Sequence, residues 1–145
     1  MAFTGDFMCT SFKQEILVKE HDFTLTTGDV FKMALYDNTA TLTAATTAYT
    51  ASGELASAGN YTTAGNALTN VTPTTSGTTA LTDFVDEVWS TATFTAYGAL
   101  IYNDSHASDA AVVVLDFLAA KTATAGDFTV IFPAADASNA IIRIA

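Results

Sequence analysis

The feature of this sequence that most constrains its fold is the placement of apolar residues at every second position in its second half. Within TATFTAYGALIY (residues 91–102), Phe94, Leu100 and Tyr102 share one parity, and threonines occupy the other. Successive side chains of a β-strand point to opposite faces, so this spacing is typical of a half-buried strand. Gly98, in the middle of the segment, indicates a bulge or the close approach of another backbone.

Four more segments predict strands of the same kind, with turns and one long excursion between them. The expected strands are DVFKMALYD (29–37), AAVVVLDF (110–117), DFTVIFP (127–133) and AIIRIA (140–145), and the expected turns are NDSHASD (103–109) and AAKTATAG (119–126). Residues 41–73 are rich in Thr, Ser and Gly, which favours an excursion outside the core. Turns at these intervals predict an all-β protein, a jelly-roll-like β-sandwich.

The segment CTSFKQEIL (9–17) predicts the one helix of the chain. Ser11 and Gln14 have the spacing of a capping box, in which each side chain satisfies a free backbone N–H group of the first helical turn. Apolar residues then follow at intervals that place them on one helical face. We therefore expect one short α-helix over about residues 11–20.

The length of 145 residues suits a single domain with a substantial core. The change from helical to alternating periodicity divides the chain into two parts. Residues 1–24 form an N-terminal arm with the short helix, and residues 25–145 form a single β-sandwich domain.

The exterior of such a sandwich has few charged residues to cover it. Charged residues make up 14% of the chain, against about 25% in an average soluble domain. Threonine and alanine number 26 and 27. A surface of hydroxyls and small apolar groups loses little side-chain entropy when another molecule covers it. The composition therefore favours a subunit with extensive protein contacts over a free enzyme.

Charge and hydropathy exclude several classes of partner. The net charge is −10, and the five cations are Lys13, Lys19, Lys32, Lys121 and Arg143. These are scattered, whereas nucleic-acid binding requires clustered cations, so we expect no nucleic acid. No apolar run reaches the length of about 18 residues that a membrane span requires, so we expect no membrane contact. A single cysteine and the lack of a visible secretory signal fit folding in a reducing cytoplasm.

We expect no catalytic residues, no cofactor and no metal. His106 has polar neighbours in NDSHASD (103–109), but a local cluster of this kind is read as a solvated turn. Cys9 precedes the helix, where a thiolate is stabilised, yet no general base is identifiable, and a small apolar anchor under the helix is the favoured interpretation. The acidic segment DFVDE (83–87) does not match a calcium-binding loop.

Trp89 is open to three interpretations. It lies just before an expected strand with parity opposite to that of Phe94, which indicates an interface position. With the tyrosines of the chain it could form a platform on which sugar rings stack. The alternative is an aromatic side chain that closes one end of the sandwich.

Six segments carry a resemblance that covers almost the whole chain. They are CTSFKQEIL (9–17), TTGDVFKMALY (26–36), TAYTASGE (47–54), GNALTNVTP (65–73), WSTATFTAYGALIYN (89–103) and AIIRIA (140–145). In these segments the chain resembles a family of small virion structural proteins of tailed bacteriophages. Some members of this family look like capsid decoration proteins, also called cement proteins.

The resemblance implies a non-enzymatic decoration protein that binds the outer capsid lattice and bridges major capsid subunits. Its partners would be the major capsid protein and further copies of itself in a homotrimer. It would be made in the host bacterial cytoplasm and located on the capsid surface of the virion. A neck, tail or head-fibre component, or a carbohydrate-binding module displayed on the virion, are the alternatives.

The candidate partner interface lies mainly in the arm. Its members are Phe3, Phe7, Phe12, Lys13, Ile16, Lys19 and Trp89. The phenylalanines are expected to serve as apolar anchors, and the lysines are expected to face an acidic patch on the partner. The alternative for this segment is that the helix only closes its own sandwich.

Overall fold

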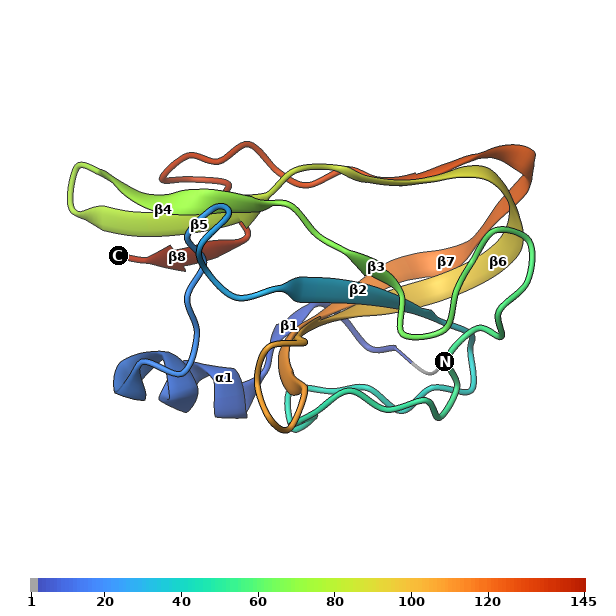
Figure 1. Ribbon diagram of the computed structural model, residues 1–145, viewed down its shortest axis with the longest axis horizontal. Helices are drawn as coiled ribbons and strands as arrows, with labels where there is room; N and C mark the ends of the chain where they lie inside the picture. Colours follow the sequence, from blue (N-terminus) through green and yellow to red (C-terminus); the bar gives the residue numbers. More distant parts are fainter. Residues whose placement is uncertain (1–2) are drawn as a thin grey trace.

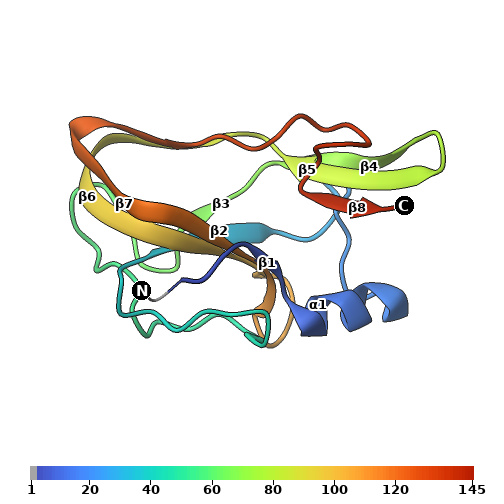
Figure 2. The same cartoon turned by 180° about the vertical axis from the view of Figure 1, so that it is seen from behind.

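The computed structural model describes residues 3–145 and contains two antiparallel sheets (Figures 1 and 2). The strands are β1 (Phe7–Met8), β2 (Phe31–Tyr36), β3 (Asn66–Ala67), β4 (Asn70–Ser76), β5 (Thr79–Phe84), β6 (Glu87–Asn103), β7 (Ala110–Val130) and β8 (Ile142–Ile144). The larger sheet has the order β1-β7-β6-β2-β3, and the smaller has the order β4-β5-β8. The expected all-β sandwich with one short N-terminal helix is confirmed.

The helix is shorter than the sequence predicts. It comprises α1 (Thr10–Glu15) and one 3-10 turn, η1 (Ile16–Val18). Cys9 is the N-cap residue and no side chain caps the helix, while the Ser11 hydroxyl is buried without a partner. The capping-box prediction is therefore wrong. Lys19 ends the helix in the left-handed conformation, with φ of 68°. No helix in residues 3–145 is long and apolar enough to cross a membrane.

A long hairpin of β6 and β7 forms the centre of the molecule. At the end remote from α1 both strands curl over, so that the same two strands contribute to both layers (Figure 1). The β6–β7 register shifts in this part, between Trp89 and Ala92 and between Ala96 and Gly98. Such bulges increase local twist and bend a strand, which lets one hairpin supply two layers.

Residues 119–126, expected to form a turn, lie inside β7. Thr122 and Thr124 pair with Thr95 and Thr93 of β6, and the Thr95 and Thr122 hydroxyl oxygens are 2.7 Å apart. Threonine fits a pleated surface well, so the partner strand extends a segment whose Ala, Thr and Gly composition is ambiguous by itself. The turn expected at 103–109 connects β6 to β7.

One carboxylate holds the long excursion together. Glu54 accepts hydrogen bonds from the Tyr49 hydroxyl at 2.5 Å, the Tyr61 hydroxyl at 2.6 Å and the Ala64 amide at 2.6 Å. Burial, followed by the bond to Glu54, raises the pKa of both tyrosines above the usual range, so their hydroxyls remain donors. The excursion was expected over 41–73, but its last part contains β3 and the start of β4.

The arm and the sandwich share one hydrophobic core. Phe12 and Phe23 of the arm meet edge to face with ring centroids 6.0 Å apart. Phe23 stacks on Phe31 of β2 at 4.3 Å, and Phe31 lies 5.7 Å from Phe84 of β5. This aromatic series joins the helix to both sheets, so the arm is part of the folded unit.

The smaller sheet holds a buried carboxylate. Asp83 is 1% exposed and accepts hydrogen bonds from the Phe84 amide at 2.8 Å and the Ile141 amide at 3.3 Å. Burial raises the pKa of Asp83 above its ordinary value, and the charge of Asp86 adds to the effect. The folded protein therefore binds a proton at Asp83 more tightly than the unfolded chain does.

This raised pKa predicts a pH dependence of stability. The contribution of Asp83 is fully present below its ordinary pKa and is lost as the pH rises through the raised value. We subtract the unfolding free energy of Asp83→Asn from that of the wild type. We expect this difference to decrease as the pH is raised from acid to neutral. Urea titrations of both proteins at a series of pH values measure this difference. A difference that is constant or rises with pH contradicts the assignment.

Candidate docking site

Two of the expected interface residues in the arm are buried inside the protein's own fold. Phe12 has no exposed surface and Phe3 is 3% exposed. The Phe3 ring lies against Gly98 of β6, where a Cβ atom would come within 2.5 Å of it. Neither side chain can contact a partner of the folded protein, which corrects the expectation for both. A chain lacking residues 1–9 would lose core side chains, so such a deletion does not test docking.

Trp89 is also buried, with 2% of its surface exposed. It lies within β6, and its ring meets Phe94 and Phe128 edge to face, with centroids 6.4 Å and 6.0 Å apart. The side chain packs among aromatic residues of the core and has no free face on which a sugar could stack. This corrects its assignment to a partner interface.

The other candidates remain accessible, and three of them gather at the helix. Lys13 and Lys19 are exposed, and Ile16 is half-buried. Sequence reasoning missed their neighbours Leu17 and Val18, which are 83% and 61% exposed. Both lie in the 3-10 turn η1, which the apolar spacing of the sequence did not distinguish from a continuous α-helix. Phe7, the remaining candidate, is half-buried in β1 at a different surface.

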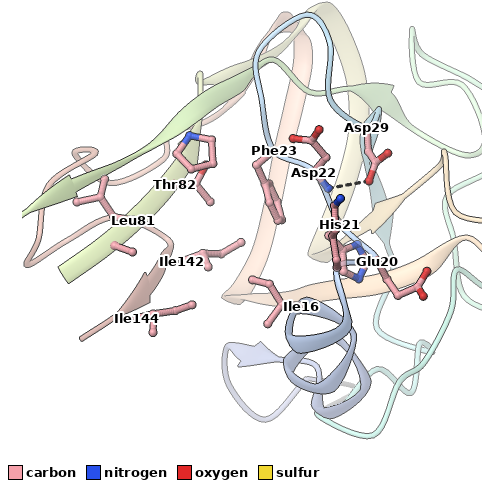
Figure 3. Close-up of a pocket in the computed structure, with 13 residues that line it drawn as sticks. Ile16, Glu20, His21, Asp22, Phe23, Asp29, Leu81, Thr82, Ile142 and Ile144 are labelled. Atoms are coloured by element: carbon pink, nitrogen blue, oxygen red, sulfur yellow. Dashed lines mark hydrogen bonds between the residues drawn. The ribbon is translucent and has the colours of Figure 1, made fainter. Parts of the chain in front are cut away.

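A groove opens between the end of the helix and the smaller sheet, with a volume of about 530 Å³. Figure 3 shows Ile16 on the helical side and Ile142 and Ile144 on the side of the sheet. Ile142 pairs with Thr82, and Ile144 pairs with Ala80. Directly paired residues share a face of a sheet, so this face of β5 and β8 forms one wall of the groove.

The rim of the groove is acidic. Glu20, Asp22 and Asp29 line it together with one cation, Lys19. Hydrogen bonds from Thr24 lower the pKa of Asp22 below its ordinary value, so this carboxylate is charged at neutral pH. An apolar floor with an excess of carboxylates at its edge fits a partner segment that carries both apolar and basic side chains.

Beneath the groove, Asn103 connects the arm to the sheet. Its side-chain oxygen accepts hydrogen bonds from the amides of Ser105 at 2.9 Å and His106 at 3.2 Å, which fixes the orientation of the side-chain amide. Its nitrogen Nδ2 therefore donates to Asp29 Oδ2 at 2.8 Å and to Nδ1 of His21 at 3.0 Å. The buried side-chain amide of Asn103 thus forms hydrogen bonds with four groups, which belong to the turn after β6, to His21 and to Asp29.

The two histidines hold the helix end against this network. Because Nδ1 of His21 is an acceptor, Nε2 carries the proton and donates to Glu15 Oε2 at 2.9 Å. The His106 ring stacks on His21 with centroids 6.0 Å apart, and its Nε2 lies 3.5 Å from Glu20 Oε2. The segment expected to be a solvated turn is therefore tied to the helix. Each histidine positions one glutamate of the arm.

Cys9 lies between the helix and the sheet and is fully buried. Burial, followed by the charge of Glu15, raises the pKa of its thiol to about 11. A protonated, enclosed thiol is a poor nucleophile. Its position is that of a small apolar residue packed under the helix.

Comparison with known proteins adds no information about this site. No known protein family, curated protein or solved structure matches this chain.

Proposed function

We propose that this protein is a non-enzymatic structural protein of a tailed-bacteriophage virion, which decorates the outer surface of the capsid. The observation that supports docking is the pair of exposed apolar residues, Leu17 and Val18, beside the groove. We define the helix-end surface as Leu17, Val18 and the groove between η1 and β8. Virion and capsid as the location rest on the sequence resemblance.

The helix-end surface has the composition of a protein-binding site. Exposed apolar side chains that adjoin an apolar hollow mark interaction surfaces more often than isolated ones do. The network below, centred on Asn103, reaches Glu15 and Glu20 on the two sides of η1 through His21 and His106, so we expect the surface to need little ordering when it binds. Less ordering on binding leaves more of the contact free energy for affinity.

Capsid stabilisation would follow from mass action. A ligand that binds only the assembled shell stabilises that shell by its binding free energy. A segment of the major capsid protein with apolar and basic side chains would enter the groove opposite Glu20, Asp22 and Asp29. Lys13 on the exposed side of the helix and Lys19 in the groove lining would each face an acidic group of the same partner. Repetition over the lattice makes the total effect large even if each contact is weak.

Leu17→Asp tests this surface directly. We expect the substitution to weaken binding to capsids that lack the protein by about tenfold or more, because it places a charge in an apolar contact. The side chain is 83% exposed, so folding is unaffected. Sedimentation of labelled protein with purified capsids measures the affinity. Val85→Asp, at a residue that is 51% exposed and outside the groove, is the control.

The result that rejects the helix-end surface is equal binding by Leu17→Asp, Val85→Asp and the wild type. A reconstruction of the virion tests the wider proposal. Copies spread over the capsid lattice support decoration, and copies confined to the neck or tail support the alternative of a neck or tail component. Purified virions without this chain reject both.

A further inference from the structure

The outer edge of β7 is open over most of its length. The first part of this edge is covered, because Ala48 forms a bridge with Ala110, the Cys9 amide donates to the Val112 carbonyl, and β1 pairs with Val113 and Val114. Strand β6 occupies the other edge of β7, and within residues 3–145 no backbone hydrogen bond reaches the outer edge over residues 117–130. The corresponding part of β6 is protected, because the excursion covers it through a hydrogen bond from the Thr93 amide to the Gly59 carbonyl. An open strand edge is a template for association.

A cleft with a volume of about 790 Å³ runs along this open edge, between the two layers. Several half-buried apolar residues line it, namely Phe7, Met8, Leu115, Phe117, Val130 and Ile141. Ile131, also in the lining, is 77% exposed. We call the open edge of β7 together with this cleft the β7 side.

A bulge beside the cleft presents one exposed leucine. Gly98 pairs with Asp116 and Ala96 pairs with Lys121, so residues 117–120 of β7 stand opposite a single residue of β6. Within this bulge Leu118 is 78% exposed and has φ of 64°.

Two aspartates build the bulge. Asp6 Oδ1 accepts from the Asp116 amide at 2.7 Å, and Asp116 Oδ1 accepts from the Leu118 amide at 2.7 Å. A left-handed conformation is unfavourable for a residue such as leucine. Strained residues that the surroundings hold in place are concentrated at functional sites, among them active sites, ligand clamps and switch regions. The strand therefore holds an apolar side chain out toward solvent next to an apolar cleft.

The charges of the β7 side suit a second copy of this chain. Three carboxylates (Asp6, Asp116 and Asp127) and two cations (Lys121 and Arg143) line it, whereas the chain as a whole has a net charge of −10. Two copies repel each other through most of their surface, but here the charges nearly balance. Each cation can face a carboxylate of the other copy.

The acidic rim at the helix end lacks this balance of carboxylates and cations. The two surfaces are therefore expected to bind different partners.

We propose that the β7 side binds a second copy of this protein, with Leu118 of one copy entering the cleft of the next. The open edge of β7 supplies backbone hydrogen-bonding groups, and the cleft supplies apolar burial. This association is independent of docking through the helix-end surface, and either can fail without the other.

Sedimentation equilibrium of the purified full chain tests the proposal. We expect the wild type to be an oligomer and Leu118→Asp to associate at least tenfold more weakly. Aspartate can adopt the left-handed conformation, but it cannot make the apolar contact. Leu17→Asp is a matched control, an equally exposed leucine at the other surface, and is expected to associate like the wild type. A monomeric wild type, or equal association by Leu118→Asp, overturns the proposal.

A labelling experiment gives an independent reading. The single native cysteine, Cys9, is fully buried, so a thiol reagent reports on an introduced cysteine alone. We expect the thiol of Leu118→Cys to react more slowly as protein concentration rises and copies associate, and that of Leu17→Cys to react at a constant rate. Equal, concentration-independent rates at both positions contradict self-association through the β7 side.

Discussion

Gly65→Ala is expected to lower the free energy of unfolding by about 4 kcal/mol. Gly65 has φ of +74°, and a Cβ atom there would lie 1.8 Å from the carbonyl oxygen of Met33 in β2. The left-handed conformation costs alanine about 1 kcal/mol, and the overlap with a buried backbone adds about 3 kcal/mol. The excursion cannot relax freely, because the Tyr61 hydroxyl accepts from the Leu35 amide of β2 at 2.9 Å and the Leu55 amide donates to the Leu35 carbonyl at 3.0 Å.

Gly77→Ala is the matched control for this prediction. Gly77 has φ of +59° at the tip of the β4–β5 hairpin, but no atom lies within 4 Å of the position of its Cβ. We expect a loss of only about 1 kcal/mol there, since conformation alone changes. Thermal unfolding distinguishes the two, with a shift of about 10 °C or more expected for Gly65→Ala. Similar losses at both positions would mean that the close approach to β2 contributes nothing.

Asn103→Ala is expected to cost about 3 kcal/mol of stability. The substitution leaves the Ser105 amide without its acceptor and Nδ1 of His21 without a donor, and it removes one donor from Asp29, whereas the His106 amide keeps the carbonyl of residue 103 at 3.3 Å. Each buried group left without a partner costs about 1–3 kcal/mol, and the adjoining solvent lets part of the network relax. Urea unfolding measures the loss, and histidine ring ¹⁵N shifts report whether His21 loses its single tautomer.

Asn66→Ala is the control for the substitution of Asn103. Asn66 is half-buried and makes one side-chain hydrogen bond, to Glu87 Oε1 at 2.8 Å, so its loss is expected to cost about 1 kcal/mol. His21 should keep its tautomer in that variant. Equal losses in the two variants, with His21 unchanged in both, would show that Asn103 does not organise the helix end.

The positions of β2, β8 and most of β6 and β7 agree with predictions from alternation. Alternation can be read from neighbouring residues alone, because successive side chains of an extended backbone point toward the core and away from it in turn. The prediction of a turn at 119–126 is wrong because its Ala and Thr residues suit either structure, and pairing with β6 decides between them. Strands β3, β4 and β5 lacked clear alternation, since small and polar residues occupy much of their length.

The candidate site was predicted only in part. Phe12 and Leu17 are both apolar and close in sequence, so composition cannot tell which enters the core and which remains exposed. In the structure Phe12 is the buried residue of α1, whereas Leu17 lies in the 3-10 turn η1 and is exposed. The groove was not predictable, because its walls come from the arm and from β8, more than a hundred residues apart. Asn103 and His21 lie 82 positions apart.

By itself, the sequence determined that this chain folds mainly into strands with one short helix near its start, because backbone periodicity and burial are linked residue by residue. Only the tertiary structure decided that Phe3, Phe12 and Trp89 belong to the core, and that Leu17 and Leu118 face solvent at two separate surfaces. The physical reason is that an apolar side chain gains from any contact that removes it from water. Which contact it finds depends on segments far away in the chain.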